Sequence, residues 1–203
     1  MIKTSSFAGL AAIALLSACG GSGETLYIGP NATPAQATAA IDALETTVEN
    51  IFNAEGNTPY ASLPGNTVSY SGLVSGEPIG GTGPAVNHAA DLSLTVDYAG
   101  DTATGEIFNF VTTQPGFANP QGTVLLAGSV DDVFSVGVIN ATGTADISQG
   151  AITATYSIAM EVQIGGTDAR AIGGGHVTEL DWQTGPDAGT SSQSSGPALA
   201  TRN

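Results

Sequence analysis

From residue 67 onward, hydrophobic and polar residues alternate with a period of two, which is typical of β-strands that bury one face. The clearest stretch is 152–164, where Tyr156, Ile158 and Val162 lie on one face and Thr, Ser, Glu and Gln residues fill most of the other. In a shorter stretch, Phe134 alternates with Val136 and Val138 and is expected to point inward. The predicted strands are 67–74, 90–98, 103–111, 123–130, 133–139, 142–148, 151–164 and 171–180.

Eight short strands joined by hairpin turns, without a second helix among them, predict an all-β fold. We expect an eight-stranded antiparallel up-and-down β-barrel over 67–182, with a two-sheet sandwich as the alternative. The barrel is favoured because hairpin follows hairpin and because closure removes exposed strand edges. The Gly/Pro-rich segments 76–87 and 112–122 are predicted to be long loops, and the Ser/Gly/Pro-rich tail 185–203 is predicted to be disordered.

One amphipathic helix is predicted in front of the strands, over 34–55. Its apolar residues recur at spacings of three and four: Ala37, Ile41, Leu44, Val48 and Ile51. Thr33 is suited to cap the helix, Pro34 is suited to its first position, and Gly56 ends the pattern. This helix is expected to pack on the barrel or to plug one end of it.

The N-terminus has the features of a secretory signal. Lys3 precedes an apolar run over 7–16 that is too short to span a bilayer, and small residues lead to Cys19, the single cysteine of the chain. This arrangement resembles the lipobox of bacterial lipoproteins, which implies a signal peptide over 1–18, acylation of Cys19 and a lipidated tether over 19–33. The alternative is an ordinary secretory signal that leaves a free thiol. The lipobox implies a bacterial outer-membrane protein held by its lipid.

The net charge of the chain excludes some classes of binding partner. The chain carries 3 Lys and Arg against 18 Asp and Glu, a net charge of −15. Nucleic-acid binding is excluded because phosphate contacts need a basic patch, and adhesion to anionic lipid is disfavoured for the same reason. A membrane contact would therefore depend on the lipid anchor.

The sequence offers little catalytic chemistry. Only His88 and His176 are present, and no nucleophile motif occurs. His176 is three residues from Glu179, so the two point to opposite faces of a strand and are interpreted as non-ligating. His88 is interpreted as a loop contact, and Trp182 as an aromatic that packs against the helix, although an aromatic at a barrel mouth can also bind a ligand. We predict a protein that is not an enzyme and has no cofactor or metal.

Three segments resemble the β-barrel domain of transferrin-binding protein B lobes, a family of bacterial surface lipoproteins. They are Tyr70-Ser71-Gly72, the hairpin residues 94–98 with 105–107, and the Gly/Ala-rich 166–174. The similarity covers about 67–182. It implies an eight-stranded barrel displayed at the cell surface. The chain has one predicted barrel and no handle domain, so no transferrin-contacting residue is carried over.

The sequence therefore predicts an outer-membrane lipoprotein that binds a macromolecular or iron- or haem-bearing partner through the loops 76–87 and 112–122. Two alternatives are a small apolar ligand held inside the barrel and a structural envelope lipoprotein without a specific ligand. Apolar residues dominate the inward face, which places the ligand alternative lower.

Overall fold

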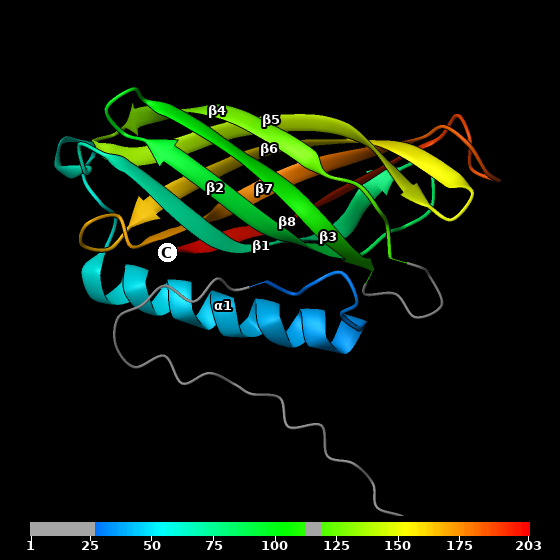
Figure 1. Cartoon of the computed structure of the whole chain (residues 1–203), viewed down its shortest axis with the longest axis horizontal. Helices are drawn as coiled ribbons and strands as arrows, with labels where there is room; N and C mark the ends of the chain where they lie inside the picture. The colour runs from blue at the N-terminus through cyan, green and yellow to red at the C-terminus, as the bar shows by residue number, and fades with distance from the viewer. Residues whose placement is uncertain (1–26, 113–118) are drawn as a thin grey trace, which may run out of the picture.

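The computed structural model describes residues 27–112 and 119–203 (Figure 1). One helix is followed by a single turn of 3-10 helix and eight strands. The elements are α1 (Pro34–Glu55), η1 (Tyr60–Ser62), β1 (Thr67–Gly81), β2 (His88–Asp97), β3 (Thr102–Thr112), β4 (Val124–Val133), β5 (Val136–Gln149), β6 (Ile152–Gly165), β7 (Ala171–Trp182) and β8 (Ser191–Arg202).

The eight strands form a closed antiparallel barrel in which each strand pairs with its neighbours in sequence and β8 returns to β1. The predicted up-and-down barrel is thus confirmed. Its interior is built by the alternation seen in the sequence. In β6, for example, Tyr156, Ile158 and Val162 are buried in the main core cluster, while Glu161 faces outward.

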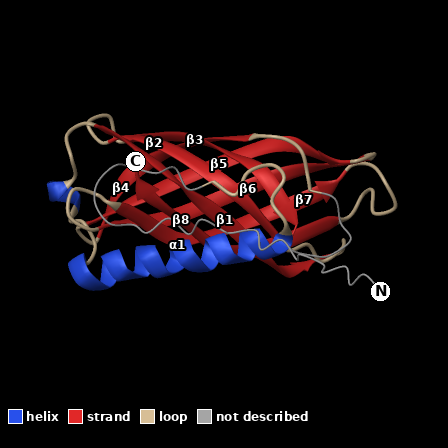
Figure 2. Cartoon of the chain, turned by 60° about the horizontal axis from the view of Figure 1, so that its bottom comes forward, coloured by secondary structure: helices blue, strands red, loops and turns tan. Residues whose placement is uncertain are grey.

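The predicted helix over 34–55 is also confirmed. The hydroxyl of Thr33 accepts the backbone N–H of Gln36 and the Gln36 side chain accepts the N–H of Thr33, which forms a capping box. Figure 2 shows α1 lying lengthwise on the outside of the barrel. Its buried Leu44 and Val48 pack against Leu73, Ala171 and Leu199 on the outer face of β1, β7 and β8. The helix therefore covers the barrel wall instead of plugging an end.

One predicted strand boundary is wrong. The expected strands 133–139 and 142–148 form the single strand β5, which pairs continuously with β6 from Val138 to Gln149. The residues at 140–141, expected to separate these two strands, stay in the sheet. The turn lies earlier, at Phe134 and Ser135.

The predicted disordered tail over 185–203 is also wrong, because Ser191–Arg202 is β8, which closes the barrel. Its small residues let it approach β1 closely. A Cβ on Gly72 would lie 1.9 Å from the Leu199 carbonyl oxygen, and one on Gly196 would lie 1.9 Å from the Ser75 carbonyl oxygen. Glycine is required at both positions for close contact of the two strands. The barrel thus extends to Arg202, beyond the predicted limit of 182.

The first of the two predicted loops is shorter than expected. β1 continues to Gly81 by pairing with β8, so only 82–87 of the segment 76–87 connects β1 to β2. Residues 113–118 of the second loop lie outside the described residues. The signal peptide, Cys19 and tether residues 19–26 also lie outside them.

Candidate functional site

The barrel has two ends of different construction. We call one end the rim: it comprises the turns 98–101, 134–135 and 166–170 together with the connector 56–66, which follows α1. We call the other end the mouth: it comprises the loop 82–87, the segment 119–123 and the turns 150–151 and 183–190. The sequence-predicted His88, His176 and Trp182 all lie in the mouth half.

His88 is buried inside the barrel at the start of β2, with 3% of its surface exposed. Its Nε2 lies 3.1 Å from the Tyr156 hydroxyl, and Nδ1 has no hydrogen-bond partner. A Cβ on Gly76 would lie 2.5 Å from His88 Cε1, so the imidazole occupies space that glycine leaves open. Burial, reinforced by the nearby His176, lowers the pKa of His88 to about 3. The prediction of a loop contact is therefore corrected to an interior one.

His176 also points inward, and its ring centroid lies 6.2 Å from that of His88. The expectation of a partly exposed surface histidine is wrong, since only 3% of the residue is exposed. Neither ring nitrogen has a hydrogen-bond partner of normal geometry. Burial lowers its pKa to about 4, although the backbone of Gly196 and Pro197 partly offsets this effect. Both histidines are neutral at pH 7 and lack a carboxylate neighbour, so they are poorly placed for acid–base catalysis at that pH.

Trp182 covers the mouth and does not pack on α1 as expected. Its Nε1–H donates to the Ser192 hydroxyl at 2.9 Å, and that hydroxyl donates to the Pro84 carbonyl at 2.7 Å. These bonds fasten the loop 82–87 across the barrel. The recess left beneath it has a volume of about 30 Å³. Small-molecule sites usually measure about 300 Å³ or more, so this recess has room for little more than a water molecule.

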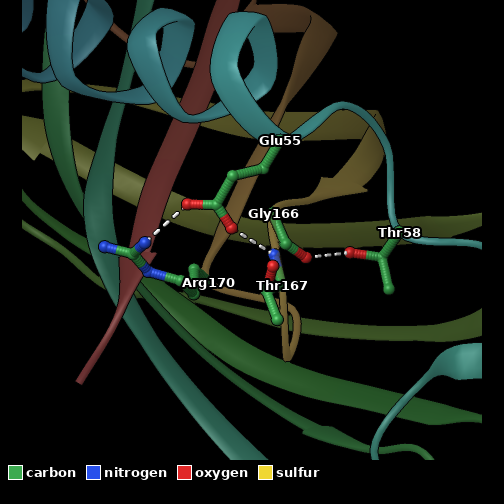
Figure 3. A network of polar contacts seen from close by, with 5 residues as sticks. All are labelled: Glu55, Thr58, Gly166, Thr167 and Arg170. Atoms are coloured by element: carbon green, nitrogen blue, oxygen red, sulfur yellow. Dashed lines mark hydrogen bonds and ion pairs between the residues drawn. The ribbon is translucent and has the colours of Figure 1, made fainter.

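The rim is held by the connector that follows α1 (Figure 3). The Glu55 carboxylate forms a 2.6 Å ion pair with Arg170 and accepts the backbone N–H of Thr167. The Thr167 bond and the Arg170 charge hold the pKa of Glu55 below its usual value. Three residues on, the hydroxyl of Thr58 donates to the Gly166 carbonyl at 2.6 Å. Helix and β6–β7 turn are thereby joined.

The connector next reaches two other turns. The Tyr60 hydroxyl donates to Asp101 in the β2–β3 turn at 2.8 Å, and the Tyr60 N–H donates to the Ser135 carbonyl in the β4–β5 turn at 3.0 Å. The bond to Asp101, followed by burial and by the charges of Asp101, Asp132 and Asp131, raises the pKa of Tyr60. Three carboxylates therefore lie around this part of the rim.

Phe134 projects from the rim, with 99% of the residue exposed. Its φ is 52° and that of Ser135 is 67°, a pair of left-handed conformations that hairpin turns normally fill with Asn or Gly. The Asp132 carboxylate accepts the Ser135 N–H at 2.8 Å, which fixes the turn. An aromatic ring is thus held in water, in a conformation that costs free energy, and no contact within the described chain compensates for it.

The sequence reasoning missed Phe134 because it assigned this residue to the inward face. In the structure, Ile139 and Ala141 of β5 belong to the core cluster, and Phe134 lies in the turn that joins β4 to β5. The signal that could have found it is Asp132 three residues before Ser135, since Asp side chains commonly accept a backbone N–H within a tight turn, as Asp132 does here. Cys19, the predicted lipidation site, is outside the described residues.

Among residues 27–112 and 119–203, no group of three His, Cys, Asp or Glu side chains could hold a metal ion. None of the helices described there is long and apolar enough to cross a membrane. We take the rim around the exposed Phe134 as the candidate site. No protein-family model, curated protein or solved structure matches the chain.

Proposed function

We propose that this chain is a bacterial outer-membrane lipoprotein, anchored through acylated Cys19, whose barrel binds a macromolecular partner through the rim. It is a binding module and not an enzyme. The observation that carries the proposal is Phe134, which is almost fully exposed in a turn whose next residue, Ser135, is hydrogen-bonded through its backbone to Tyr60 and Asp132. Rigid aromatic residues are the usual anchors of protein interfaces, because little side-chain freedom is lost on binding.

The choice of rim over mouth rests on how each end is filled. The mouth loop 82–87 is fastened by Ser192 and contributes Val86 to the lining of a recess of about 30 Å³. A small apolar ligand inside the barrel would have to displace this packing. A partner could instead contact the exposed aromatic side chain at the rim without displacing any packed side chain. The partner site is thus moved from the loops favoured by the sequence to the opposite end.

The charged residues at the rim indicate which charges a partner surface would carry. Asp101, Asp131 and Asp132 lie around Tyr60, whose N–H binds the turn that carries Phe134. The two arginines of the described chain are engaged elsewhere: Arg170 with Glu55 and Arg202 with a backbone carbonyl. A complementary surface would hold an apolar pocket bordered by Lys or Arg. An iron-bearing protein is the first class of partner to test, because of the resemblance noted in the sequence.

The test is capture of iron-loaded transferrin, haemoglobin and solubilised envelope proteins by the lipid-free chain beginning at residue 20. Phe134→Asn is compared with Val177→Asn, a matched control on the outer wall of β7 where the native side chain is 52% exposed. We expect Phe134→Asn to weaken capture of a specific partner by tenfold or more, since anchors of this kind contribute about 2 kcal/mol. Equal capture by the two variants would reject the rim as the binding surface.

The anchor is tested separately. Cys19→Ser should release the protein from the membrane fraction or leave it uncleaved, because electrostatic adhesion cannot hold a chain of net charge −15 on an anionic surface. The control is the unchanged chain, which should remain with membranes through a high-salt wash. Membrane retention of a processed Cys19→Ser protein would contradict the lipid anchor.

A further inference from the structure

A buried carboxylate lies on the outer wall of the barrel. Asp91 of β2 is fully buried although its neighbours Ala90 and Leu92 are the ones that face the interior. Its two oxygens accept the backbone N–H groups of Ile28 at 2.5 Å and Gly29 at 3.2 Å. Burial raises its pKa even though these donors lower it. A buried charge is costly unless it is fully hydrogen-bonded, so this residue has a specific structural role.

The neighbouring strand is distorted to complete the contact. The β2–β3 register shifts between Ala89 and Asp91, which marks a bulge in β3. Asn109 in that bulge has a φ of 52°, and its Nδ2 donates to Asp91 at 2.7 Å. The left-handed conformation of Asn109 and the bulge in β3 therefore both help to bind the Asp91 carboxylate.

The segment that Asp91 holds is residues 27–32, which we call the strap. Tyr27 stacks edge-on against Phe108 with ring centroids 5.2 Å apart, and Ile28 packs against both outer apolar clusters. At the far end of the strap, the Asn119 side chain donates to the Ala32 carbonyl at 3.3 Å. The strap is therefore held at several points along its length before α1 begins.

The position of the strap limits how far the barrel can move from an anchored Cys19. Cys19 precedes Tyr27 by eight residues, a span of at most about 29 Å when fully extended. Without the strap, the first fixed point would be Thr33 at the start of α1, fourteen residues from Cys19 and at most about 50 Å away. We infer that Asp91 and the strap limit how far the barrel can rise above the bilayer. This inference builds on the lipid anchor in the proposed function.

The first part of the test examines the strap in the lipid-free chain. Amide hydrogen exchange at Ile28 and Gly29 should be slow, and Asp91→Ala should accelerate it at least about tenfold while barrel amides stay protected. Asp97→Asn, in the same strand, is the control and should leave both amides slow. Gly29→Pro provides a second route that spares the barrel, because proline removes the N–H and cannot adopt the φ of 81° found there. Fast exchange at Ile28 and Gly29 in the unchanged chain would overturn the inference.

The second part measures height. The chain from residue 19 is coupled through Cys19, its only cysteine, to maleimide-bearing lipid in a supported phosphatidylcholine bilayer, and neutron reflectometry gives the mean distance of the protein layer. We expect Asp91→Ala and Gly29→Pro to raise that distance by up to about 20 Å, and Asp97→Asn to leave it unchanged. An unchanged distance in strap-released variants would overturn the inference. Chemical coupling makes the result independent of native acylation, so failure of the anchor proposal is recognised separately by fractionation of Cys19→Ser.

Discussion

The two ends of the barrel differ in which side chains are buried and in which of the buried polar groups are hydrogen-bonded. At the rim, the buried tyrosine hydroxyls are paired: those of Tyr70 and Tyr98 lie 2.6 Å apart, and Tyr70 also donates to the Ala169 carbonyl. Phe134, by contrast, is an apolar side chain that lies exposed at the rim. At the mouth, the apolar side chains that fill the barrel interior, such as Leu180 and Trp182, are covered, although Ile79 and Leu125 on the outer wall are exposed. His88 and His176 are buried there, and each has an unpaired ring nitrogen. The rim is therefore suited to contact another molecule, and the mouth is the part of the fold most sensitive to protonation.

Acid should destabilise the mouth more than any other part. Burial lowers the pKa of His88 to about 3 and that of His176 to about 4, against about 6.5 in an unfolded chain. Between those values the unfolded state binds more protons, so stability falls as pH falls below 6.5. Well below pH 6.5 each histidine contributes a slope that approaches about 1.4 kcal/mol per pH unit, and together they contribute roughly 4 kcal/mol between pH 7.5 and 5.

Urea unfolding at pH 7.5, 6 and 5 measures this effect. The double variant His88→Leu, His176→Leu serves as control. It should lose most of the dependence of stability on pH in this range, because the two groups that titrate are removed while the carboxylates are unchanged. A slope equal to that of the unchanged chain would show that the histidines are not buried in neutral form.

The next largest effect should come from the close approach of β8 to β1 near the mouth. Gly196→Ala would place a Cβ 1.9 Å from the Ser75 carbonyl oxygen, a backbone atom that cannot move aside locally. We expect a loss of at least about 3 kcal/mol in the free energy of unfolding. Gly175→Ala is the matched control, because its Cβ would meet nothing closer than the Gly196 oxygen at 3.9 Å. Similar melting of the two variants would argue against β8 as the closing strand.

At the rim, the buried hydroxyl of Thr58 tests the connector. Thr58→Val keeps the shape of the side chain but removes the 2.6 Å bond to the Gly166 carbonyl. We expect a loss of about 1 kcal/mol in thermal or urea unfolding. Thr144→Val, on the exposed face of β5, is a suitable control and should have little effect. If Thr58→Val also weakens partner capture, the connector supports binding as well as folding.

The smallest change in stability, and the most informative one, is expected at Phe134. Phe134→Asn places a residue that tolerates a positive φ at a turn position of 52° and should raise stability by up to about 1 kcal/mol. The same variant should lose partner binding. A substitution that stabilises the fold and removes binding would separate the role of this side chain from folding. Destabilisation by Phe134→Asn would mean that the ring makes a contact needed by the fold.

The elements with strong hydrophobic periodicity were predictable from the sequence. Elements whose position depends on close contacts with a neighbouring strand were not. α1 and β6 carry clear apolar stripes, so the helix and the barrel class followed directly. β8 is built of Ser, Gly, Ala and Pro, and its place in the sheet depends on close contacts with β1. The predicted count of eight strands agreed with the structure only because β5 was divided in two while β8 was missed.

The candidate site was harder to predict for a related reason. The alternation that correctly identifies buried residues in a long strand fails at a turn, where positive φ angles at Phe134 and Ser135 end the strand pattern. His88 and His176 were interpreted as exposed or loop residues because a polar side chain is normally outside. Their burial depends on space provided by glycines such as Gly76, which periodicity does not reveal.

The most direct measurement of the central claim is site-specific photo-crosslinking in cells that carry the acylated protein. A benzoyl-phenylalanine at position 134 is compared with one at Val177, which is also exposed but lies on the outer wall of β7. The account predicts a discrete covalent adduct with one macromolecule from position 134, reduced by high salt, and none from position 177. No adduct from position 134, or the same adducts from both positions, would contradict the rim as the docking surface.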